Sequence, residues 1–418
     1  MPDFSEKSAP KRSGVRVFYV AAAGDLVGSY ESWSKQVDVE TEVAKTYSGS
    51  IFDFVNRAGH EGLFISTSRV GASVQDASIR VENIQIPAGR SGVKYYVDWM
   101  VSSAILLKRC LTYKPDVAVV SDRRIFFPFL FVAKLYRIKV INVMHVAFFS
   151  DLEKPKGFKR LLLKADSLFI RWGCDYLLGV SQEIIDQSWR LCRSKPPQGA
   201  AFIPQWRRDR FDRILDIRPS DEVFSLTFLG RMERNKGIFD LLRAFCWLRD
   251  KGYRVTLAYL GDGGALGELR AEIERLGLAD VVSTYGHCSG DQVIEALAQT
   301  HLVVVPTRSE FVEGLNKVAI EAVLSGRPVV TSQVCQALSL IREAAFEATP
   351  DDWTSYARCI EHAIIDPVAY NDAVGAARRL RRNFFDPSQS IGHKLEKAFT
   401  ALRLVGDAEE EHPAPIAP

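Results

Sequence analysis

Long apolar runs are missing from this sequence. The most apolar stretch, Ile125 to Leu135, is short and is interrupted by Pro128 and Lys134, whereas a helix that crosses a bilayer needs roughly 20 consecutive apolar residues. The first thirteen residues are polar and charged and lack the apolar centre of a secretion signal. We therefore expect a cytoplasmic protein without membrane-spanning helices.

Paired cysteines and metal-binding spacings are also missing. The seven cysteines are an odd number, and none forms a CxxC pair or a Cys/His spacing typical of zinc sites. This pattern predicts reduced thiols rather than disulfides. It also predicts that the protein has no bound metal and no resident cofactor.

The net charge of +3 is small, but the basic residues are unevenly distributed. Residues 101–200 contain 17 basic and 8 acidic side chains. A basic segment attracts an anionic lipid surface or an anionic acceptor, and an ordinary solvated basic face explains the count equally well. We expect no nucleic-acid partner.

The length and the order of apolar segments predict two α/β domains. A chain of 418 residues, 47% hydrophobic and 25% charged, exceeds one ordinary core. Apolar strands alternate with helical stretches, which is typical of parallel sheets covered by helices. The pattern restarts after a Pro- and Arg-rich seam at 195–219. The expected strands lie at 15–20, 62–66, 116–120, 139–144 and 175–181 before the seam, and at 224–229, 253–260, 281–285, 302–305 and 328–331 after it.

One strand–loop–helix–strand unit carries two carboxylates. Glu313 lies in the loop after the strand 302–305, and Glu321 lies eight residues later on a helix expected from about 315 to 325, with Gly326 closing it. The start of such a helix offers unpaired N–H groups to an anion. The unit therefore suits a nucleotide-sugar, although two glutamates on an ordinary surface helix are the simpler alternative.

A second loop places two cations near each other after the strand 224–229. Gly230 and Gly237 permit tight turns there, and Arg231 and Lys236 can converge on one anionic group such as a diphosphate. Alone, this loop is a weak signal, and solvated surface charges would explain it. The Gly-rich turn at 261–264 lacks the spacing of a dinucleotide fingerprint and is interpreted as a structural turn.

Taken together, these motifs resemble the retaining group 1 (family 4) glycosyltransferases of GT-B fold. The resemblance covers residues 224–332 and rests on Gly230-Arg231 with Lys236-Gly237, Leu260-Gly261-Asp262-Gly263, Tyr285-Gly286-His287, Val305-Pro306-Thr307, Glu313-Gly314 with Glu321-Ala322, and Gly326 to Val330. It departs from the family at the first loop, Ala21 to Gly28, and after Val330, where Thr331 to Ala337 replaces a Gly-rich loop.

The resemblance implies a GT-B fold with two Rossmann-like domains whose parallel sheets face a central cleft. The acceptor domain would span residues 1–205, the donor domain 206–385, a helix crossing back 386–405, and a disordered tail 406–418. The implied catalytic residues are His145, Arg231, Lys236 and Glu313. The implied donor contacts are Gly24, Gly230, Arg231, Lys236, His287, Glu313, Gly314, Leu315, Asn316 and Glu321.

The resemblance also implies transfer of a sugar from a nucleotide-diphosphate sugar to an acceptor hydroxyl, with retention and without a metal, in polysaccharide or glycoconjugate synthesis. The acceptor would be a sugar, a glycolipid or another small molecule. A GT-B-fold nucleotide-sugar epimerase and a non-catalytic nucleotide-sugar-binding protein are the alternatives. The basic and apolar stretch 154–164, with Phe169 and Trp172 nearby, suggests peripheral contact with the inner face of a membrane. A helix that buries Leu161 to Leu163 in the core is the competing interpretation.

Overall fold

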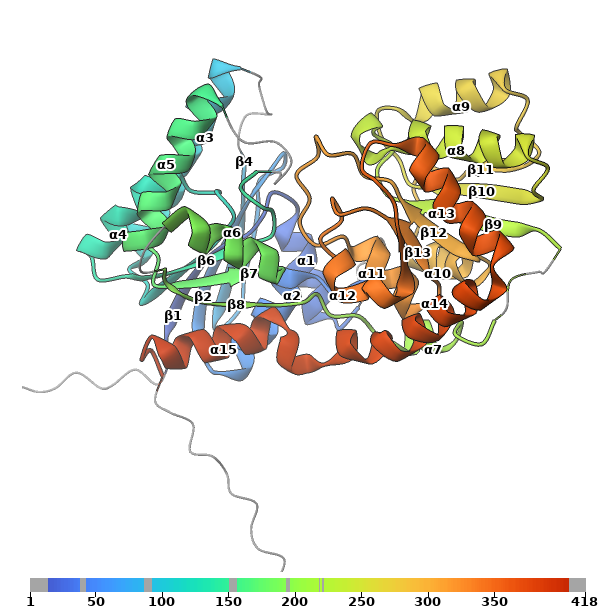
Figure 1. The fold of residues 1–418 in the computed structure, drawn as a ribbon. Helices are drawn as coiled ribbons and strands as arrows, with labels where there is room; N and C mark the ends of the chain where they lie inside the picture. Colours follow the sequence, from blue (N-terminus) through green and yellow to red (C-terminus); the bar gives the residue numbers. More distant parts are fainter. Residues whose placement is uncertain are drawn as a thin grey trace, which may run out of the picture.

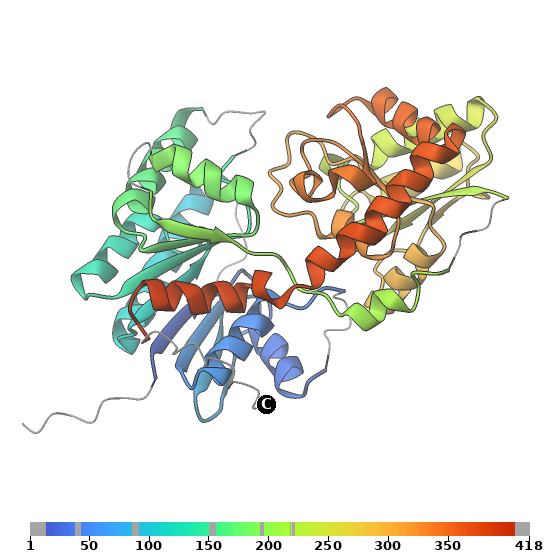
Figure 2. The ribbon, with the colours of Figure 1, turned by 60° about the horizontal axis from the view of Figure 1, so that its bottom comes forward.

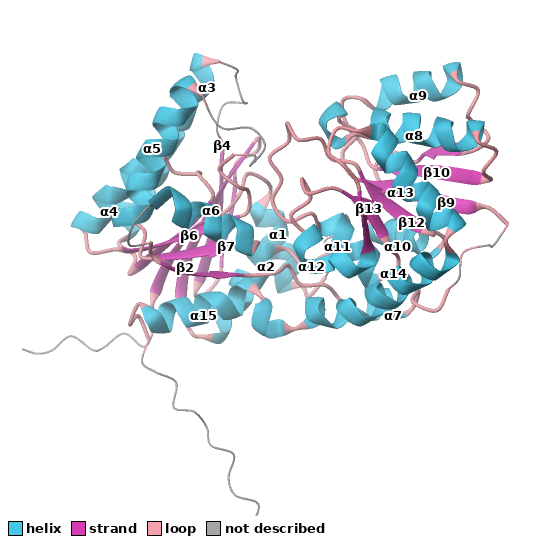
Figure 3. Cartoon of the chain, viewed as in Figure 1, coloured by secondary structure: helices cyan, strands magenta, loops and turns pink. Residues whose placement is uncertain are grey.

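Two parallel-dominated sheets, one in each half of the chain, organise the computed structural model (Figures 1 and 3). The structure describes residues 14–37, 43–85, 92–149, 156–192, 196–217, 219 and 222–405. The predicted tail at 406–418 lies outside the described residues.

The first sheet has eight strands in the order β3-β4-β2-β1-β5-β6-β7-β8, and only the pair β3–β4 is antiparallel. The interior strands β5 and β6 are buried along almost their whole length, as expected for a sheet covered on both faces. The strands are β1 (Arg16–Val20), β2 (Glu61–Ser68), β3 (Ala72–Gln75), β4 (Ile79–Gln85), β5 (Val117–Ser121), β6 (Lys139–Met144), β7 (Tyr176–Gly179) and β8 (Gln198–Ala201).

Helices connect the strands of the first sheet and begin where side chains cap them. Asp25 accepts a hydrogen bond from the Gly28 amide at the start of α1, and Thr46 accepts one from Gly49 at the start of α2. The helices are α1 (Leu26–Ser34), α2 (Tyr47–Arg57), α3 (Val93–Tyr113), α4 (Phe131–Leu135), which follows the 3-10 turn Phe127–Leu130, α5 (Gly157–Trp172) and α6 (Gln182–Cys192). The short helix α7 (Arg208–Asp212) lies between the two sheets in sequence.

The second sheet has six strands in the order β11-β10-β9-β12-β13-β14, and its five pairings are all parallel. Its strands are β9 (Phe224–Leu229), β10 (Val255–Leu260), β11 (Val282–Thr284), β12 (Leu302–Val305), β13 (Val329–Thr331) and β14 (Ala345–Glu347). Its helices are α8 (Ile238–Asp250), α9 (Leu266–Arg275), α10 (Gly290–Ala298), α11 (Lys317–Leu324), α12 (Leu338–Ile341), α13 (Trp353–Ile365) and α14 (Pro367–Leu380).

The last helix, α15 (Ile391–Ala401), returns to the first domain and packs against α2 (Figure 2). The rings of Phe54 and Phe399 lie 4.9 Å apart, and His60 stacks on Phe399 at 5.5 Å. Gly392 permits the close approach, since a Cβ there would lie 2.9 Å from the Ser50 carbonyl oxygen. The predicted GT-B architecture, including this crossing helix, is confirmed.

Two segments connect the domains, one after β8 and one before α15. They lie side by side, because the Ile203 amide donates to the Gln389 carbonyl at 2.8 Å. The domain boundaries at residues 205 and 385 stay predictions. Among the described residues, no helix combines the length and the apolar character needed to span a membrane.

Candidate active site

The loop that follows β9 brings the first two predicted cations to the carboxyl edge of the second sheet. Gly230 (φ +145°) and Gly237 (φ +73°) have backbone conformations that favour glycine. A Cβ on Gly237 would lie 2.0 Å from the Pro306 carbonyl oxygen, so the loop presses directly against the end of β12. This contact fixes the position of the loop and therefore of Arg231 and Lys236.

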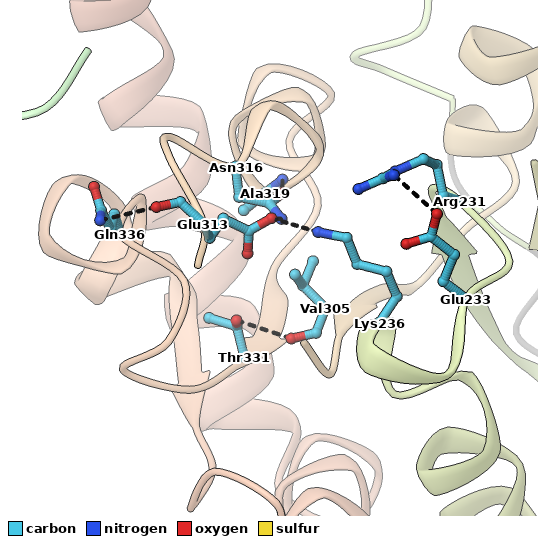
Figure 4. A network of polar contacts seen from close by, with 9 residues as sticks. All are labelled: Arg231, Glu233, Lys236, Val305, Glu313, Asn316, Ala319, Thr331 and Gln336. Carbon is cyan, nitrogen blue, oxygen red and sulfur yellow. Dashed lines mark hydrogen bonds and ion pairs between the residues drawn. The ribbon is translucent and has the colours of Figure 1, made fainter. Parts of the chain in front are cut away.

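Lys236 makes a buried ion pair instead of standing free for a ligand. Its Nζ lies 2.8 Å from Glu313 Oε1 (Figure 4). The same atom lies 3.6 Å from the centre of the Phe311 ring. Arg231 is bonded to Glu233 at 2.8 Å, and its guanidinium lies 5.6 Å from the same ring. The two cations therefore share one aromatic neighbour, and Arg231 stays largely exposed.

Glu313 is the most constrained carboxylate of the site. Its Oε1 accepts hydrogen bonds from Lys236 and from the side-chain amide of Asn316, 3.0 Å away, and the Gln336 amide donates to its carbonyl at 3.1 Å. Its other oxygen, Oε2, is buried and has no hydrogen-bond partner among the described residues. Buried polar atoms are normally paired, so Oε2 is available to a donor group of a ligand.

Asn316 also caps the helix that follows. Its Oδ1 accepts the Ala319 amide at 3.0 Å, so α11 starts at Lys317, two residues later than expected, with Leu315 nearly buried before it. The first amides of the helix have no partner within it. At the other end, Gly326 has φ +71° and terminates the helix as predicted.

Glu321 is buried, and a residue of the segment that follows β8 holds its side chain in place. Its Oε1 accepts a hydrogen bond from the Trp206 indole at 3.1 Å, and the residue is 6% exposed. The sequence does not indicate this partner, because Trp206 lies 115 positions away in the seam. The position of the Glu321 carboxylate is thus fixed by a residue of the connecting segment.

His145 follows β6 in the first domain, where the sequence analysis expects a ligand-facing histidine. Asp122 Oδ1 accepts the backbone amides of His145 and Val146, and its Oδ2 lies 3.5 Å from the imidazole Nδ1. Burial raises the pKa of Asp122, but the hydrogen bonds and the charge of His145 outweigh it, so the net pKa is lowered. The imidazole Nε2 is buried without a hydrogen-bond partner among the described residues.

The two domains touch at this point. Gly314 pairs with Val146 through an antiparallel bridge, and a Cβ on Gly314 would lie only 1.8 Å from the His145 carbonyl oxygen. Ser181 donates to the side-chain oxygen of Gln336 at 2.7 Å, and the Lys317 ammonium lies 5.3 Å from the Tyr47 ring. The contact therefore brings the Glu313 and His145 segments together across the cleft.

The first loop contributes less than its position suggests. The amide of Gly24 donates to Thr67 at 3.0 Å, and its carbonyl accepts from Ser66 at 2.8 Å. The first amides of α1, those of Leu26 and Val27, are already bonded to Asn83 Oδ1. Gly24 can leave room for a ligand, but the start of α1 has no free amides for a phosphate.

His287 is exposed and follows the carboxyl end of β11. The preceding Gly286 pairs with Gly261, and a Cβ on Gly261 would lie 1.9 Å from the Gly230 carbonyl oxygen. The glycine turn at 261–264 is thus structural, since it lets adjacent loops pack backbone to backbone.

The cysteines offer no reactive thiol. All seven are free, and burial raises the pKa of Cys335, the one beside Gln336, to about 12. No group of three or more potential metal ligands occurs among the described residues.

The structure brings Lys236, Glu313, Asn316 and His145 into one cluster and holds Glu321 and Arg231 at its margins. Sequence reasoning missed Asp122, Trp206, Phe311 and Gln336. Phe311 and Gln336 lie inside the segment already singled out, but their roles depend on side-chain direction, which has no sequence signal.

Comparison with known proteins bears on the family and the fold. Residues 210–380 match the family described as glycosyl transferases group 1. A glycogen synthase of Mycobacterium tuberculosis is 22% identical over 333 residues, covering 76% of each chain.

Solved structures share the fold over nearly the whole chain. A sucrose-phosphate synthase from Thermosynechococcus elongatus superposes with a TM-score of 0.69 at 16% identity, covering 94% of this chain and all of the other. The Anabaena protein HepE, solved in complex with UDP, has a TM-score of 0.65 at 15% identity and covers 93% of this chain and 100% of its own.

Proposed function

Because residues 210–380 match the group 1 glycosyltransferases and the chain has the GT-B fold, we propose that it is a retaining hexosyltransferase that uses a nucleotide-diphosphate sugar without a metal. The observation that carries the proposal is the pair of unsatisfied polar atoms in the cluster. Glu313 Oε2 and His145 Nε2 are buried without partners, on segments that touch through Gly314. Sugar hydroxyls are the ligand groups that would satisfy both.

The diphosphate of the donor would lie between Lys236, Arg231 and the start of α11. An ammonium, a guanidinium and unpaired helix amides are suited to an anion whose charge grows as the sugar leaves. Lys236 would exchange its contact with Glu313 for one with a phosphate oxygen. That exchange releases Glu313 Oε1 toward the sugar, so donor binding and sugar recognition are coupled through one ion pair.

The reaction is a same-face substitution at the anomeric carbon. The bond from this carbon to the phosphate oxygen breaks, the bond to the acceptor oxygen forms, and the acceptor proton passes to the departing phosphate. Glu313 acts by hydrogen bonding to the sugar and not as a nucleophile, because the acceptor oxygen attacks the anomeric carbon directly; Asn316 stays bonded to its Oε1 when Lys236 moves to the phosphate. His145 would position the sugar, with Asp122 fixing the ring.

Glu321 would bind the ribose hydroxyls, and the exposed end of β11 near His287 would border the base. The Anabaena structure contains UDP, and we expect a nucleoside diphosphate of this kind here. We place the enzyme in the cytoplasm at the inner membrane face, in polysaccharide or glycoconjugate synthesis, with a sugar, a glycolipid or a small-molecule acceptor and no nucleic-acid partner.

Ligand-induced thermal stabilisation is the first test. UDP, GDP and ADP are compared with uridine at equal concentration, since a ligand at 100 times its Kd stabilises the native state by about 2.7 kcal/mol. We expect one diphosphate to raise the Tm and uridine to have little effect. No stabilisation by any diphosphate would refute the donor site.

Labelled nucleotide-sugars then test the reaction, with EDTA present and absent. We expect transfer or slow hydrolysis that EDTA leaves unchanged, and a product whose anomeric configuration equals that of the donor by NMR. Interconversion of nucleotide-sugars without an acceptor would identify an epimerase. Binding without turnover would identify a non-catalytic protein.

A further inference from the structure

A stripe of exposed apolar side chains follows α3. Their spacing of three and four residues places most of them on one side of the helix, and each is more than one third exposed. The large ones are Val93, Tyr95, Val97, Met100, Val101 and Ile105. A soluble surface rarely leaves so many large apolar groups together without a partner.

A second stripe follows α5, the neighbouring helix (Figure 1). Phe158, Leu161, Leu168 and Trp172 are 55–61% exposed. The rings of Tyr96 and Phe158 lie 5.1 Å apart, which joins the two stripes into one surface. The competing expectation that this helix buries Leu161 to Leu163 in the core is met only in part, because Leu161 is exposed and Leu162 half-buried, while Leu163 packs against the core. Phe169, which the sequence places near Trp172, is fully buried.

A groove continues this surface beside the C-terminal half of α3. It has a volume of about 510 Å³ and is lined by apolar side chains that include Leu107, Leu111, Phe129 and Val132. Tyr136, at its edge, is 62% exposed. The groove gives an apolar chain a place to lie against the protein.

The charges around the stripes have one dominant sign. The two helices carry Lys94, Lys108, Arg109, Lys159, Arg160, Lys164 and Arg171, and only two acids, Asp98 and Asp166. Asp166 is buried and paired with Arg123 at 3.1 Å, so it does not offset the surface charge. An apolar stripe flanked by lysine and arginine is typical of a helix that lies in a membrane interface.

We propose that the α3–α5 face, meaning the exposed sides of these two helices and the adjoining groove, docks on an anionic lipid bilayer. A second copy of this chain is a poorer occupant, because it would bring seven more basic side chains against the same seven. An anionic bilayer supplies both the apolar interior and the opposite charge.

The topology relates this surface to the cleft. Each of these helices follows one parallel strand of the first sheet and precedes the next, so both begin at its carboxyl edge, where His145 follows β6. Docking would therefore place the acceptor side of the cleft close to the lipid surface. The inference rests on the proposed function in one respect: it identifies the acceptor as a lipid-linked one.

Vesicle co-sedimentation of the full chain tests the surface. The probes are vesicles of phosphatidylcholine alone and vesicles with phosphatidylglycerol added, at low and high salt. We expect binding to the anionic vesicles that high salt weakens, and at least roughly tenfold weaker binding for Val97→Glu/Leu161→Glu. Both positions are more than half exposed, so the fold should tolerate the change.

The matched control is Ile365→Glu/Val368→Glu, which introduces the same charges at equally exposed apolar positions of the second domain. It should bind vesicles like the wild type. Equal binding by the stripe variant and the wild type, or no binding at all, would overturn the proposal. So would a wild-type dimer that the stripe variant converts to monomers, because a second copy would then occupy the face.

Thermal stabilisation by nucleoside diphosphates, measured on the same proteins, separates the two proposals. The donor site is in the second domain, so the stripe variant should keep it. Vesicle binding without diphosphate binding would refute the enzyme assignment and leave the docking surface standing. Diphosphate binding without vesicle binding would refute the docking surface and leave the enzyme assignment standing.

Discussion

Gly314→Ala is the substitution that most directly tests whether the cleft must close for catalysis. Gly314 has no positive φ, so alanine fits its backbone without strain. The added Cβ, however, would lie 1.8 Å from the His145 carbonyl oxygen of the other domain. The substitution therefore leaves each domain intact and obstructs only their contact.

The size of the effect follows from that distance. A Cβ essentially never comes within 3.0 Å of another heavy atom, so the two segments must separate by at least about 1.2 Å. A misplacement of about 1 Å can cost about 100-fold in rate, which corresponds to about 2.7 kcal/mol of transition-state stabilisation. We expect kcat to fall by about this factor.

The assay compares sugar transfer and nucleoside diphosphate binding for the two proteins. Binding should change little, because Lys236 and the start of α11 belong to one domain. Gly264→Ala is the control, since that glycine also has no positive φ and has nothing within 4 Å of its Cβ position. A Gly314→Ala enzyme with wild-type kcat would show that this contact has no part in catalysis.

Three further substitutions test single groups. Lys236→Met should weaken diphosphate binding by roughly 10- to 100-fold. It should also destabilise the protein by about 3–5 kcal/mol, because Glu313 loses its partner. Adding Glu313→Gln to this variant should restore the Tm but not the diphosphate binding measured by calorimetry. Asp122→Asn should lower kcat by roughly 10- to 100-fold with unchanged diphosphate binding, because the His145 ring loses its charged neighbour; unchanged kcat would exclude this role. Burial raises the pKa of Asp166 to about 6, above its unfolded value, so its proton contributes stability that is complete below about pH 4 and is lost as the pH rises through 6. Chemical denaturation should therefore show Asp166→Asn gaining stability relative to the wild type between pH 4 and 7, and a pH-independent difference would contradict the assignment.

The order of strands and the cation-bearing loops could be predicted because they depend on local signals. The fully apolar run Leu302–Val305 is a buried strand, and Gly326 ends α11 where the pattern indicates. Gly230 and Gly237 mark the loop that carries Arg231 and Lys236, since each has a positive φ. These features are decided within a few residues of chain.

The helix α3 and the antiparallel pair β3–β4 could not be predicted in the same way. Six large apolar residues of α3 face outward, so its sequence does not show the single apolar stripe of a helix that covers a core. Strand β3 has no buried residue and gives no alternation of apolar and polar side chains.

The pairing of side chains within the candidate site could not be predicted from the sequence. Arg231 and Lys236 are expected to converge on an anion, and the structure pairs Lys236 with Glu313, 77 positions away. We propose that exchanging this partner for a phosphate releases Glu313 Oε1 from Lys236, beside the cross-domain contact at Gly314, while Asn316 stays bonded to it. The contact between Gly314 and Val146 is made by backbone atoms, so it needs no large or charged side chain at position 314. The absence of a side chain at Gly314 is what permits this contact, and we propose that the site responds to its donor through an ion pair in one domain and a glycine that faces the other.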